Sequence, residues 1–312
     1  MTLASVQKRF DTLHQQSRIA AGSLIVSVLG DAVLPRGGRI WLGSLIGLMA
    51  TLGVNERLVR TSVFRLVKDE WLQTETQGRR ANYALTPVGH RRFDEASRHI
   101  YAAHAPAWDH RWRLVCLVGE LVPRTRETLR RSMAWQGFGE WGAGLFVHPS
   151  ADLESCMDAL RSDGLVDVLP SLMPLMADNP QFSGFASDAD MVRRAWDLEQ
   201  LAAGYAGFMA DYEPVLKEVK ANARRAVEGA SAFVARTLMV HDFRRLLLRD
   251  PELPAVLLPA RWPGQQARDL CRELYQRLLP ASEGYLDQHL QLATGEVPIA
   301  STLVMQRFGP GA

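Results

Sequence analysis

Apolar side chains recur at helical spacing between residues 55 and 69. Val59, Val63 and residues 66–67 follow the i, i+4, i+7, i+8 pattern of a single buried stripe. Asn55 precedes this stripe and can cap the first helical turn with its side-chain oxygen. The opposite face carries basic and polar side chains: Arg57, Arg60, Thr61, Arg65 and Lys68. The pattern therefore predicts an amphipathic helix whose exposed face is positively charged.

A strand–turn–strand unit follows this helix. Residues 71–74 and 83–86 are predicted as strands, with a basic turn at residues 77–82 between them. Three residues of the turn could reach a nucleic-acid backbone: Arg79, Arg80 and Asn82. A helix followed by a hairpin with a basic tip is typical of a winged helix-turn-helix, whose helix enters the DNA major groove. We therefore expect this part of the chain to bind double-stranded DNA.

Further elements are expected on both sides of this unit. Residues 17–34 and 42–52 have the pattern of buried helices, and residues 35–41 leave room for a short strand between them. Gly53 can end the second helix by adopting a left-handed conformation. A connecting helix is expected over residues 88–101.

The centre of the chain alternates between strand and helix patterns. Strands are expected at residues 112–119, 144–148 and 166–169, and helices at residues 124–135 and 151–162. This order suggests a small ferredoxin-like α+β domain.

The remaining segments are expected to be connections and helices. The glycine-rich residues 137–144 read as a connection or bulge, and residues 170–187 read as a loop. Helical patterns then cover 191–210, 212–225, 230–249, 264–279 and 282–293.

We therefore predict a multidomain α+β protein. Residues 1–103 would form the winged helix-turn-helix with its linker helix, residues 104–187 the ferredoxin-like domain, and residues 188–312 a mostly helical C-terminal domain.

Charge is unevenly distributed along the chain, although its formal net value is only +2. Residues 1–99 contain 14 basic and 8 acidic residues, whereas the remainder contains 22 basic and 26 acidic residues. A basic first third joined to an acidic body fits a nucleic-acid-binding module, with chance asymmetry as the alternative.

The sequence favours a cytoplasmic protein without membrane spans. The longest apolar stretch, near residues 24–34, is interrupted by Gly30 and Asp31 and is too short to cross a bilayer. The N-terminus lacks a secretory pattern. The three cysteines are far apart and form neither a CxxC motif nor a zinc-binding spacing, which favours reduced thiols.

Enzymatic and metal-binding motifs are absent from the sequence. The candidate acid–base or metal-ligating residues show no HExxH-type spacing: Asp109, His110, His148, His241 and Asp242. Solvated or capping histidines are the preferred interpretation, and no metal, cofactor or enzymatic activity is expected. A thioesterase or nuclease with a DNA-binding tether remains a remote alternative.

Residues 241–264 leave two interpretations open. One is a helix end followed by a proline-rich loop on which Trp262 packs. The other is a ligand-binding or dimer surface, with Arg244, Arg245 and Arg261 available to an anion.

Three motifs together resemble the PaaX family of bacterial transcriptional repressors of phenylacetate catabolism. The N-terminal motif comprises residues 52–67 and 78–86, the central one residues 108–115, and the C-terminal one residues 241–245 and 250–264. The resemblance spans roughly residues 20–290, with the motifs in the family's order.

This resemblance implies a homodimeric repressor of phenylacetate (aryl-acid) catabolic genes, which binds a palindromic operator and is released by phenylacetyl-CoA. A different aryl-acid or aryl-CoA effector is the alternative. An aryl-CoA pocket should combine cationic side chains with aromatic ones. The candidates for it are Arg111, Trp112, Arg113, Trp141, Tyr205, His241, Arg244, Arg245 and Trp262. Residues 1–19 align with no motif, which leaves open whether they touch DNA or a partner subunit.

Overall fold

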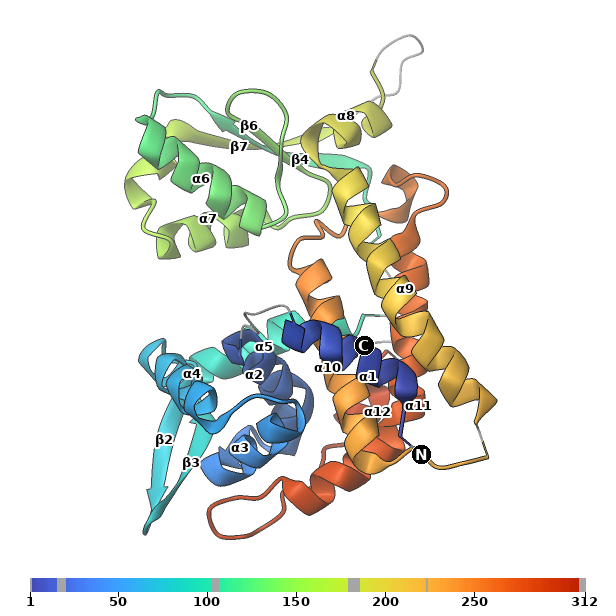
Figure 1. Cartoon of the computed structure of the whole chain (residues 1–312). Coiled ribbons are helices and arrows are strands. Elements are labelled where there is room, and N and C mark those ends of the chain that lie inside the picture. The colour runs from blue at the N-terminus through green and yellow to red at the C-terminus, as the bar shows by residue number, and fades with distance from the viewer. Residues whose placement is uncertain (1, 16–20, 103–106, 179–185, 223, 309–312) are drawn as a thin grey trace. The chain divides into compact units, whose positions relative to one another are not determined.

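The computed structural model describes residues 2–15, 21–102, 107–178, 186–222 and 224–308 (Figure 1). The chain divides into two compact units. The first unit comprises Met1–Ala103, Ala206–Arg244 and Gln266–Ala312, and the second comprises His104–Tyr205 and Arg245–Gln265. Both contain helices and a small sheet, as the expected α+β class requires. The three predicted domain ranges stay a prediction.

The first predicted helix of the N-terminal module is helical from residue 21 to the predicted end of the segment, but it changes its hydrogen-bonding pattern on the way. Helix α2 (Ala21–Val28) continues as a π turn (Leu29–Val33) and a 3-10 turn (Leu34–Arg36), and residues 16–20 lie outside the described residues. Gly37 and Gly38 follow with φ angles of 87° and 69°. Because glycine adopts left-handed conformations readily, this pair redirects the chain into strand β1 (Arg39–Trp41).

The next elements follow the predicted order. Helix α3 (Leu42–Thr51) is followed by Gly53, whose φ is 74°. Helix α4 (Glu56–Lys68) begins after Asn55, whose side-chain oxygen accepts a 3.0 Å hydrogen bond from the Leu58 amide. The predicted cap and the left-handed glycine are thus both confirmed.

A three-stranded antiparallel sheet completes the module. Strands β2 (Leu72–Gln77) and β3 (Arg80–Leu85) are longer than predicted and pair from Gln77 opposite Arg80, so the turn between them is short. The strand order is β1-β3-β2. Helix α5 (Pro87–Ile100) then begins after Thr86, whose hydroxyl oxygen accepts from the Gly89 amide.

The C-terminal helices complete the core of the first unit. Beside the apolar stripe of α4 and the buried faces of α2 and α3 lie four side chains from α10, α11 and the residue that follows α11: Phe233, Leu238, Leu286 and Leu290. The module therefore does not bury its apolar surface with residues 1–103 alone.

The helical region breaks at other positions than predicted, since helix α8 (Asp188–Ala195) ends inside the expected helix 191–210. Helices α9 (Leu198–Ala221) and α11 (Pro263–His289) each run through a position where two helices were expected, and Pro214 and Pro280 lie inside them. Helix α10 (Gly229–Leu247) separates them, and α12 (Leu303–Gln306) follows. Proline removes one helical hydrogen bond, but fully buried neighbours such as Val215 and Leu278 keep these segments packed.

The N-terminal helix α1 (Ala4–Gln15) packs on the first unit's own helices. The Glu218 carboxylate of α9 accepts from the amides of Ala4 and Ser5 at 2.9 and 3.0 Å. Arg9 donates to both carboxylate oxygens of Asp242 on α10, at 2.9 and 2.8 Å. These contacts tie the segment that matches no motif to α9 and α10.

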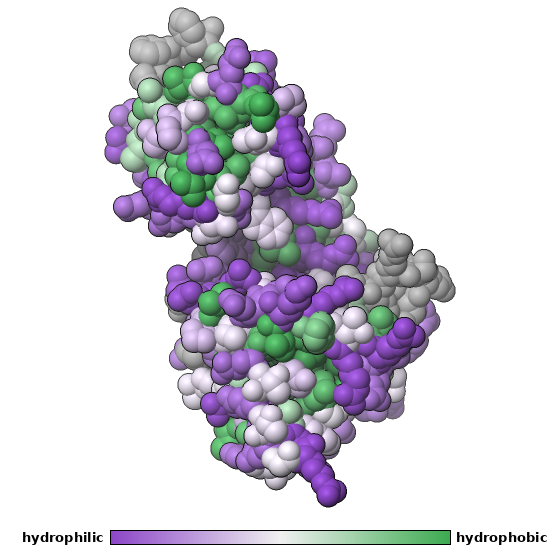
Figure 2. All heavy atoms as spheres, turned by 90° about the vertical axis from the view of Figure 1, so that its left-hand side faces the viewer, coloured by the Kyte–Doolittle hydropathy of each residue, from purple (hydrophilic) through white to green (hydrophobic). Residues whose placement is uncertain are grey.

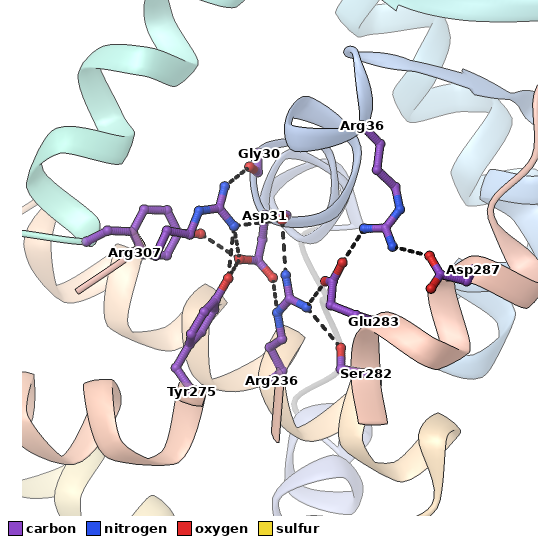
Figure 3. Close-up of polar contacts among 10 residues, drawn as sticks. Gly30, Asp31, Arg36, Arg236, Tyr275, Ser282, Glu283, Asp287 and Arg307 are labelled. Carbon is purple, nitrogen blue, oxygen red and sulfur yellow. Dashed lines mark hydrogen bonds and ion pairs between the residues drawn. The ribbon is translucent and has the colours of Figure 1, made fainter. Parts of the chain in front are cut away.

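A buried carboxylate connects the module to the C-terminal helices (Figure 3). Asp31 is 3% exposed, and it accepts hydrogen bonds from Tyr101 at 2.6 Å, Tyr275 at 3.1 Å and Arg307 at 2.8 Å. The Arg236 guanidinium lies 2.7 Å from its other oxygen. Burial raises the pKa of Asp31, but Arg236 and Arg307 outweigh that effect, so the pKa is lowered.

The same network extends along α11. Arg236 also pairs with Glu283 and donates to Ser282, while Arg36 donates to Glu283 at 2.5 Å and to Asp287 at 2.6 Å. We call this network the Asp31 cluster: Asp31, Arg36, Tyr101, Arg236, Tyr275, Ser282, Glu283, Asp287 and Arg307 (Figure 3). It joins the turn after α2, the end of α5, and helices α10 and α11.

The second unit is built on a four-stranded antiparallel sheet of order β5-β6-β4-β7. Its elements in chain order are β4 (Arg111–Leu117), α6 (Pro123–Trp135), β5 (Gly139–Glu140), β6 (Leu145–His148), α7 (Leu153–Ser162) and β7 (Leu172–Asp178). The short β5 lies in the glycine-rich segment that was expected to be a connection.

The last strand of this sheet was misplaced by the sequence pattern. Residues Val166–Ser171 form a 3-10 helix rather than a strand, and β7 lies inside the segment 170–187 that was expected to be a loop. Proline at position 174 suggested a loop, but an edge strand tolerates a missing amide donor. Residues 179–185 of that segment lie outside the described residues.

Both faces of this sheet pack against other elements, while the edge strand β7 is largely exposed. Helices α6 and α7 lie on one face, where Val115 and Phe146 pack with Leu129 (Figure 1). On the other face, Trp112 and Val147 pack with residues of α8 (Asp188–Ala195) and of the segment 253–258. Helix α8 starts at a Ser187–Asp190 capping box.

Candidate nucleic-acid interface

Helix α4 presents its charged face to solvent while Val59, Val63 and Leu66 are buried. Successive residues of an α-helix turn by about 100°. On this geometry Arg57, Thr61, Phe64 and Lys68 occupy the centre of the exposed face, and Arg60 and Arg65 lie on its two flanks. The five predicted DNA-binding residues of this helix are all exposed, as a groove-binding face requires.

Two of these side chains make local contacts on the helix. Arg60 donates to the Glu56 carboxylate at 2.8 Å, and both side chains are more than half exposed. Ion pairs at such exposed positions contribute little stability, so the Arg60 guanidinium can exchange this partner for a phosphate. The Thr61 hydroxyl donates to the Arg57 carbonyl at 2.9 Å.

The hairpin separates the three predicted wing residues. Gly78 has a φ of 61° and Arg79 is exposed beside it at the turn. Arg80 stands over the Trp41 ring at 4.6 Å and donates to the Ala293 carbonyl.

Asn82 is placed differently from its predicted role. It is 6% exposed, and its side-chain oxygen accepts from the Ala293 amide at 2.7 Å. Residues two positions apart in a strand point to the same face, so Arg80 and Asn82 share one face of β3. This face contacts residues that follow α11. Asn82 therefore holds the C-terminal segment in place. Because its side chain is buried and hydrogen-bonded there, we no longer count it among the candidate DNA contacts.

The end of α11 also fixes β1 and α3. The Trp41 amide donates to the Gln291 carbonyl at 3.0 Å, and the Ser44 hydroxyl donates to the His289 carbonyl at 2.6 Å. The position of the candidate DNA-binding elements thus depends on residues 289–293.

Sequence reasoning missed one prominent side chain of the interface. Phe64 is 70% exposed at the centre of the α4 face. A helical projection identifies it, because it follows Arg57 by seven positions and precedes Lys68 by four. The view onto the side that carries α4 and the β2–β3 hairpin shows hydrophobic side chains surrounded by hydrophilic ones (Figure 2).

The candidate effector residues form small separate groups: His241 and Arg244 both contact Ser27, Trp141 packs on the cluster that contains Trp112, and Tyr205 contacts Trp262. His241 and Arg244 belong to the first unit, whereas the others belong to the second: Arg111, Trp112, Arg113, Trp141, Tyr205, Arg245 and Trp262. The adjacent Trp112 and Arg113 have separate roles, because successive strand residues point to opposite faces. Trp112 is 1% exposed and donates to Asp188, while Arg113 donates to both oxygens of Asp109.

His241 and Arg244 connect α10 to α2. The His241 ring nitrogen lies 3.0 Å from the Ser27 hydroxyl, and Arg244 donates to the Ser23 hydroxyl at 2.7 Å. These two residues therefore join the C-terminal helices to the helix that packs beside α4.

The remaining effector candidates are more accessible. Arg111 pairs with Asp178 at 3.0 Å and is about half exposed, and Arg245 is exposed. Trp262 is half-buried and packs edge-on against Tyr205, with ring centroids 6.1 Å apart, as the packed-loop interpretation predicted.

A cavity of about 570 Å³ lies between α9 and α11 in the first unit and is lined by none of these candidates. Its lining includes the carboxylates of Glu213, Asp269 and Glu273. Arg272 also lines the cavity and pairs with Asp269, and Glu273 pairs with Lys220 and Arg277, so both signs of charge are present there.

The histidines considered as ligands have other surroundings. His148 is buried, and its Nδ1 accepts from the amides of Ser150 and Ala151 at 3.0 and 2.7 Å. Burial lowers the pKa of His148 to about 4, so its ring is neutral at pH 7. Among the described residues, no group of three or more His, Cys, Asp or Glu side chains is placed to hold a metal ion. Within the same residues, no helix has the length and apolar character needed to cross a membrane.

Three families cover most of the chain. Residues 20–89 match the family described as PaaX-like protein, residues 105–180 the PaaX protein central Cas2-like domain, and residues 196–288 the PaaX-like protein C-terminal domain.

Similar proteins extend the relationship over the full sequence. Transcriptional repressor PaaX of Escherichia coli (strain K12) is 37% identical over 291 residues, which cover 93% of this chain and 90% of that protein. The structure of uncharacterized protein Rv0674 from Mycobacterium tuberculosis matches with a TM-score of 0.50 and 25% identity, covering 78% of this chain and 90% of that one. These relationships place the protein among transcriptional regulators and not among enzymes, and the chain belongs to the PaaX family of transcriptional repressors.

Proposed function

We propose that the protein is a ligand-responsive repressor that binds operator DNA through the module spanning α2 to α5. One observation carries this proposal: the exposed face of α4 presents basic residues beside a hairpin with Arg79 at its turn. The 37% identical relative is itself named a transcriptional repressor. Duplex DNA is the polyanion that such a helix and hairpin fit together.

The module has the element order of a winged helix-turn-helix. Helices α2, α3 and α4 are followed by the β2–β3 hairpin, and β1 closes the sheet against β3. In this fold α4 is the recognition helix, and Arg79 at the turn contacts the flanking phosphates. In the second unit, the strand order β5-β6-β4-β7 with α6 and α7 on one face supports a ferredoxin-like fold.

The proposal is tested with the double variant Arg57→Ala, Lys68→Ala of the full chain. Its affinity for a duplex selected from a random pool by the wild-type protein is measured by fluorescence anisotropy at several salt concentrations. Loss of two phosphate contacts should weaken binding and reduce the salt slope by about 0.9 per contact. The matched control is Arg131→Ala, Arg193→Ala, whose side chains are 70% and 71% exposed in the second unit. Equal affinity and slope for wild type and Arg57→Ala, Lys68→Ala would contradict the assignment of α4.

We further propose that the repressor acts as a homodimer on a palindromic site. Two copies of α4 related by a two-fold axis bind two half-sites. The number of protein–DNA contacts doubles, and the same residues make them in each half-site. Selection from the random pool should therefore recover inverted repeats, and sedimentation of the complex should show two chains per duplex. Recovery of single half-sites bound by one chain would contradict this part of the proposal.

Phenylacetyl-CoA is the proposed effector, and another aryl-CoA or aryl acid is the alternative. A ligand can release DNA only if it binds the DNA-free conformation more tightly. The contacts of His241 and Arg244 with α2 provide a route from α10 to the module. The candidate phosphate-binding cations are the accessible Arg111 and Arg245.

Calorimetric titration distinguishes the effectors. The full chain is titrated with phenylacetyl-CoA, phenylacetate and free CoA, each with and without the selected duplex. Phenylacetyl-CoA should bind more weakly when DNA is present, and Arg111→Ala, Arg245→Ala should lose affinity for it relative to Arg131→Ala. Binding of phenylacetyl-CoA that DNA leaves unchanged would rule it out as the releasing ligand.

A further inference from the structure

Phe64 occupies an unusual position for a large apolar side chain. It is 70% exposed, and among the aromatic residues whose side chains the structure describes only Trp135 is as exposed. Single exposed apolar residues are common on protein surfaces and need no function. Phe64 differs because it lies at the centre of the α4 face, with Arg57, Thr61 and Lys68 along the same row.

The surroundings of Phe64 indicate what it contacts. A protein partner that received this ring in an apolar pocket would also have to accommodate the cations on both sides of it. Duplex DNA accommodates both, because its phosphates attract the cations and its major groove carries one apolar group, the C5 methyl of thymine. The combination of a ring and flanking cations therefore favours a base edge over a protein pocket.

The neighbouring polar group is already engaged. The Thr61 hydroxyl donates its hydrogen to the Arg57 carbonyl at 2.9 Å and so has no second hydrogen to offer a base acceptor. The centre of the face therefore relies on apolar contact rather than on a hydroxyl donor.

We propose that Phe64 is a specificity-determining residue that recognises a thymine through its C5 methyl group in the major groove. This inference rests on the proposed function, since it assumes that α4 is the recognition helix. The cations of α4 then supply affinity for phosphates, and Phe64 distinguishes thymine from bases that lack the methyl group.

The experiment replaces thymines with deoxyuridine, which removes the methyl group and leaves base pairing intact. The duplex selected by the wild-type chain is substituted one thymine at a time in each half-site, and binding is measured by competition anisotropy. At one position the wild-type protein should lose about fourfold in affinity, as expected for one desolvated methyl group. The Phe64→Ala variant should bind the thymine and uracil duplexes equally well.

Two variants control for other effects. Phe64→Leu keeps an apolar side chain and should retain part of the discrimination, and Trp135→Ala removes the equally exposed aromatic of the second unit and should behave as wild type. Because Phe64 is largely exposed, Phe64→Ala should unfold at the wild-type denaturant midpoint, which separates recognition from folding.

The outcomes separate this inference from the proposed function. If the wild-type chain binds the selected duplex but no uracil substitution weakens it, or if Phe64→Ala keeps the discrimination, Phe64 does not read thymine. A wild-type chain that binds no duplex overturns the proposed function as well. Unchanged discrimination together with loss of self-association in Phe64→Ala assigns the ring to a protein interface and overturns the inference.

Discussion

At the scale of single residues, Asp31 shows how a buried charge is made compatible with the core. Removing a carboxylate from water is strongly unfavourable unless charged and hydrogen-bonding partners replace the solvent. Asp31 receives two tyrosine hydroxyls, Tyr101 and Tyr275, and two guanidinium groups, Arg236 and Arg307. Arg236 is 1% exposed and depends in turn on two carboxylates, Asp31 and Glu283.

Replacing this carboxylate should therefore destabilise the protein strongly. We expect Asp31→Asn to lower the free energy of unfolding by about 3–5 kcal/mol, because it removes the carboxylate that pairs with the largely buried Arg307 and leaves Arg236 with Glu283 as its carboxylate partner. Urea unfolding of the full chain measures the loss. The control is Asp178→Asn, whose side chain is 76% exposed. Equal urea midpoints for wild type and Asp31→Asn would show that the pairing of Asp31 contributes no stability.

The same variant has a predicted pH signature. Because the folded pKa of Asp31 is lowered, its contribution is complete above the unfolded value of about 3.9 and is lost as the pH falls through the lower folded value. The difference in unfolding free energy between wild type and Asp31→Asn should thus shrink on acidification below about pH 4.

At the scale of elements, local chemistry predicted some features well and tertiary packing decided others. Asn55 and Gly53 mark helix ends by their own hydrogen-bonding and backbone preferences, so both could be recognised in the sequence. Strand β7 could not, because its Pro174 is acceptable only at a sheet edge, and the sequence does not show which strand lies there. Phe64 was missed for a different reason, since the charged face was described only by its polar members.

The close approach of α5 to Trp71, the residue before β2, gives a test at this scale. A Cβ added at Gly89 would lie 2.3 Å from the Trp71 carbonyl oxygen, which already accepts from the Thr86 amide. Gly89→Ala should therefore lower the unfolding free energy by about 1–3 kcal/mol through forced displacement of the backbone.

Helix α3 provides the matched control for this substitution. Gly47 has open space at its Cβ position, so Gly47→Ala should increase stability by about 0.5–1 kcal/mol through helix propensity. Opposite signs for the two glycines are the expected result in denaturant melts. A Gly89→Ala variant as stable as Gly47→Ala would mean that α5 is not held against Trp71.

At the scale of the whole molecule, the packing joins the predicted DNA-binding module to the C-terminal helices in one compact unit. Its core includes Phe233 and Leu286, and its buried carboxylate depends on residues from α10, α11 and the segment around Arg307. The sequence pattern divides the chain by local composition, whereas the packing assigns three separated segments to the first unit. Local periodicity cannot report such contacts, because they join residues more than 200 positions apart.

A fragment of residues 1–103 should consequently fold poorly. Without Arg236, Tyr275 and Arg307, it retains Asp31 with only the Tyr101 hydroxyl and exposes the apolar faces that α10 and α11 cover. We expect little cooperative thermal unfolding by circular dichroism. Asp31→Leu in the fragment should recover part of the helical signal because it removes the uncompensated charge. A fragment that melts as cooperatively as the full chain would show that the module is autonomous.

The contact between Arg307 and Asp31 has a consequence for synthesis on the ribosome. Chains emerge from their N-terminus at about 5–20 residues per second, and Arg307 follows Asp31 by 276 residues. Many seconds therefore pass between the synthesis of helices α2 to α5 and the arrival of Arg307, the last partner of the Asp31 carboxylate. During that interval the apolar surface that α10 and α11 cover in the folded protein is open, which gives chaperones time to protect it.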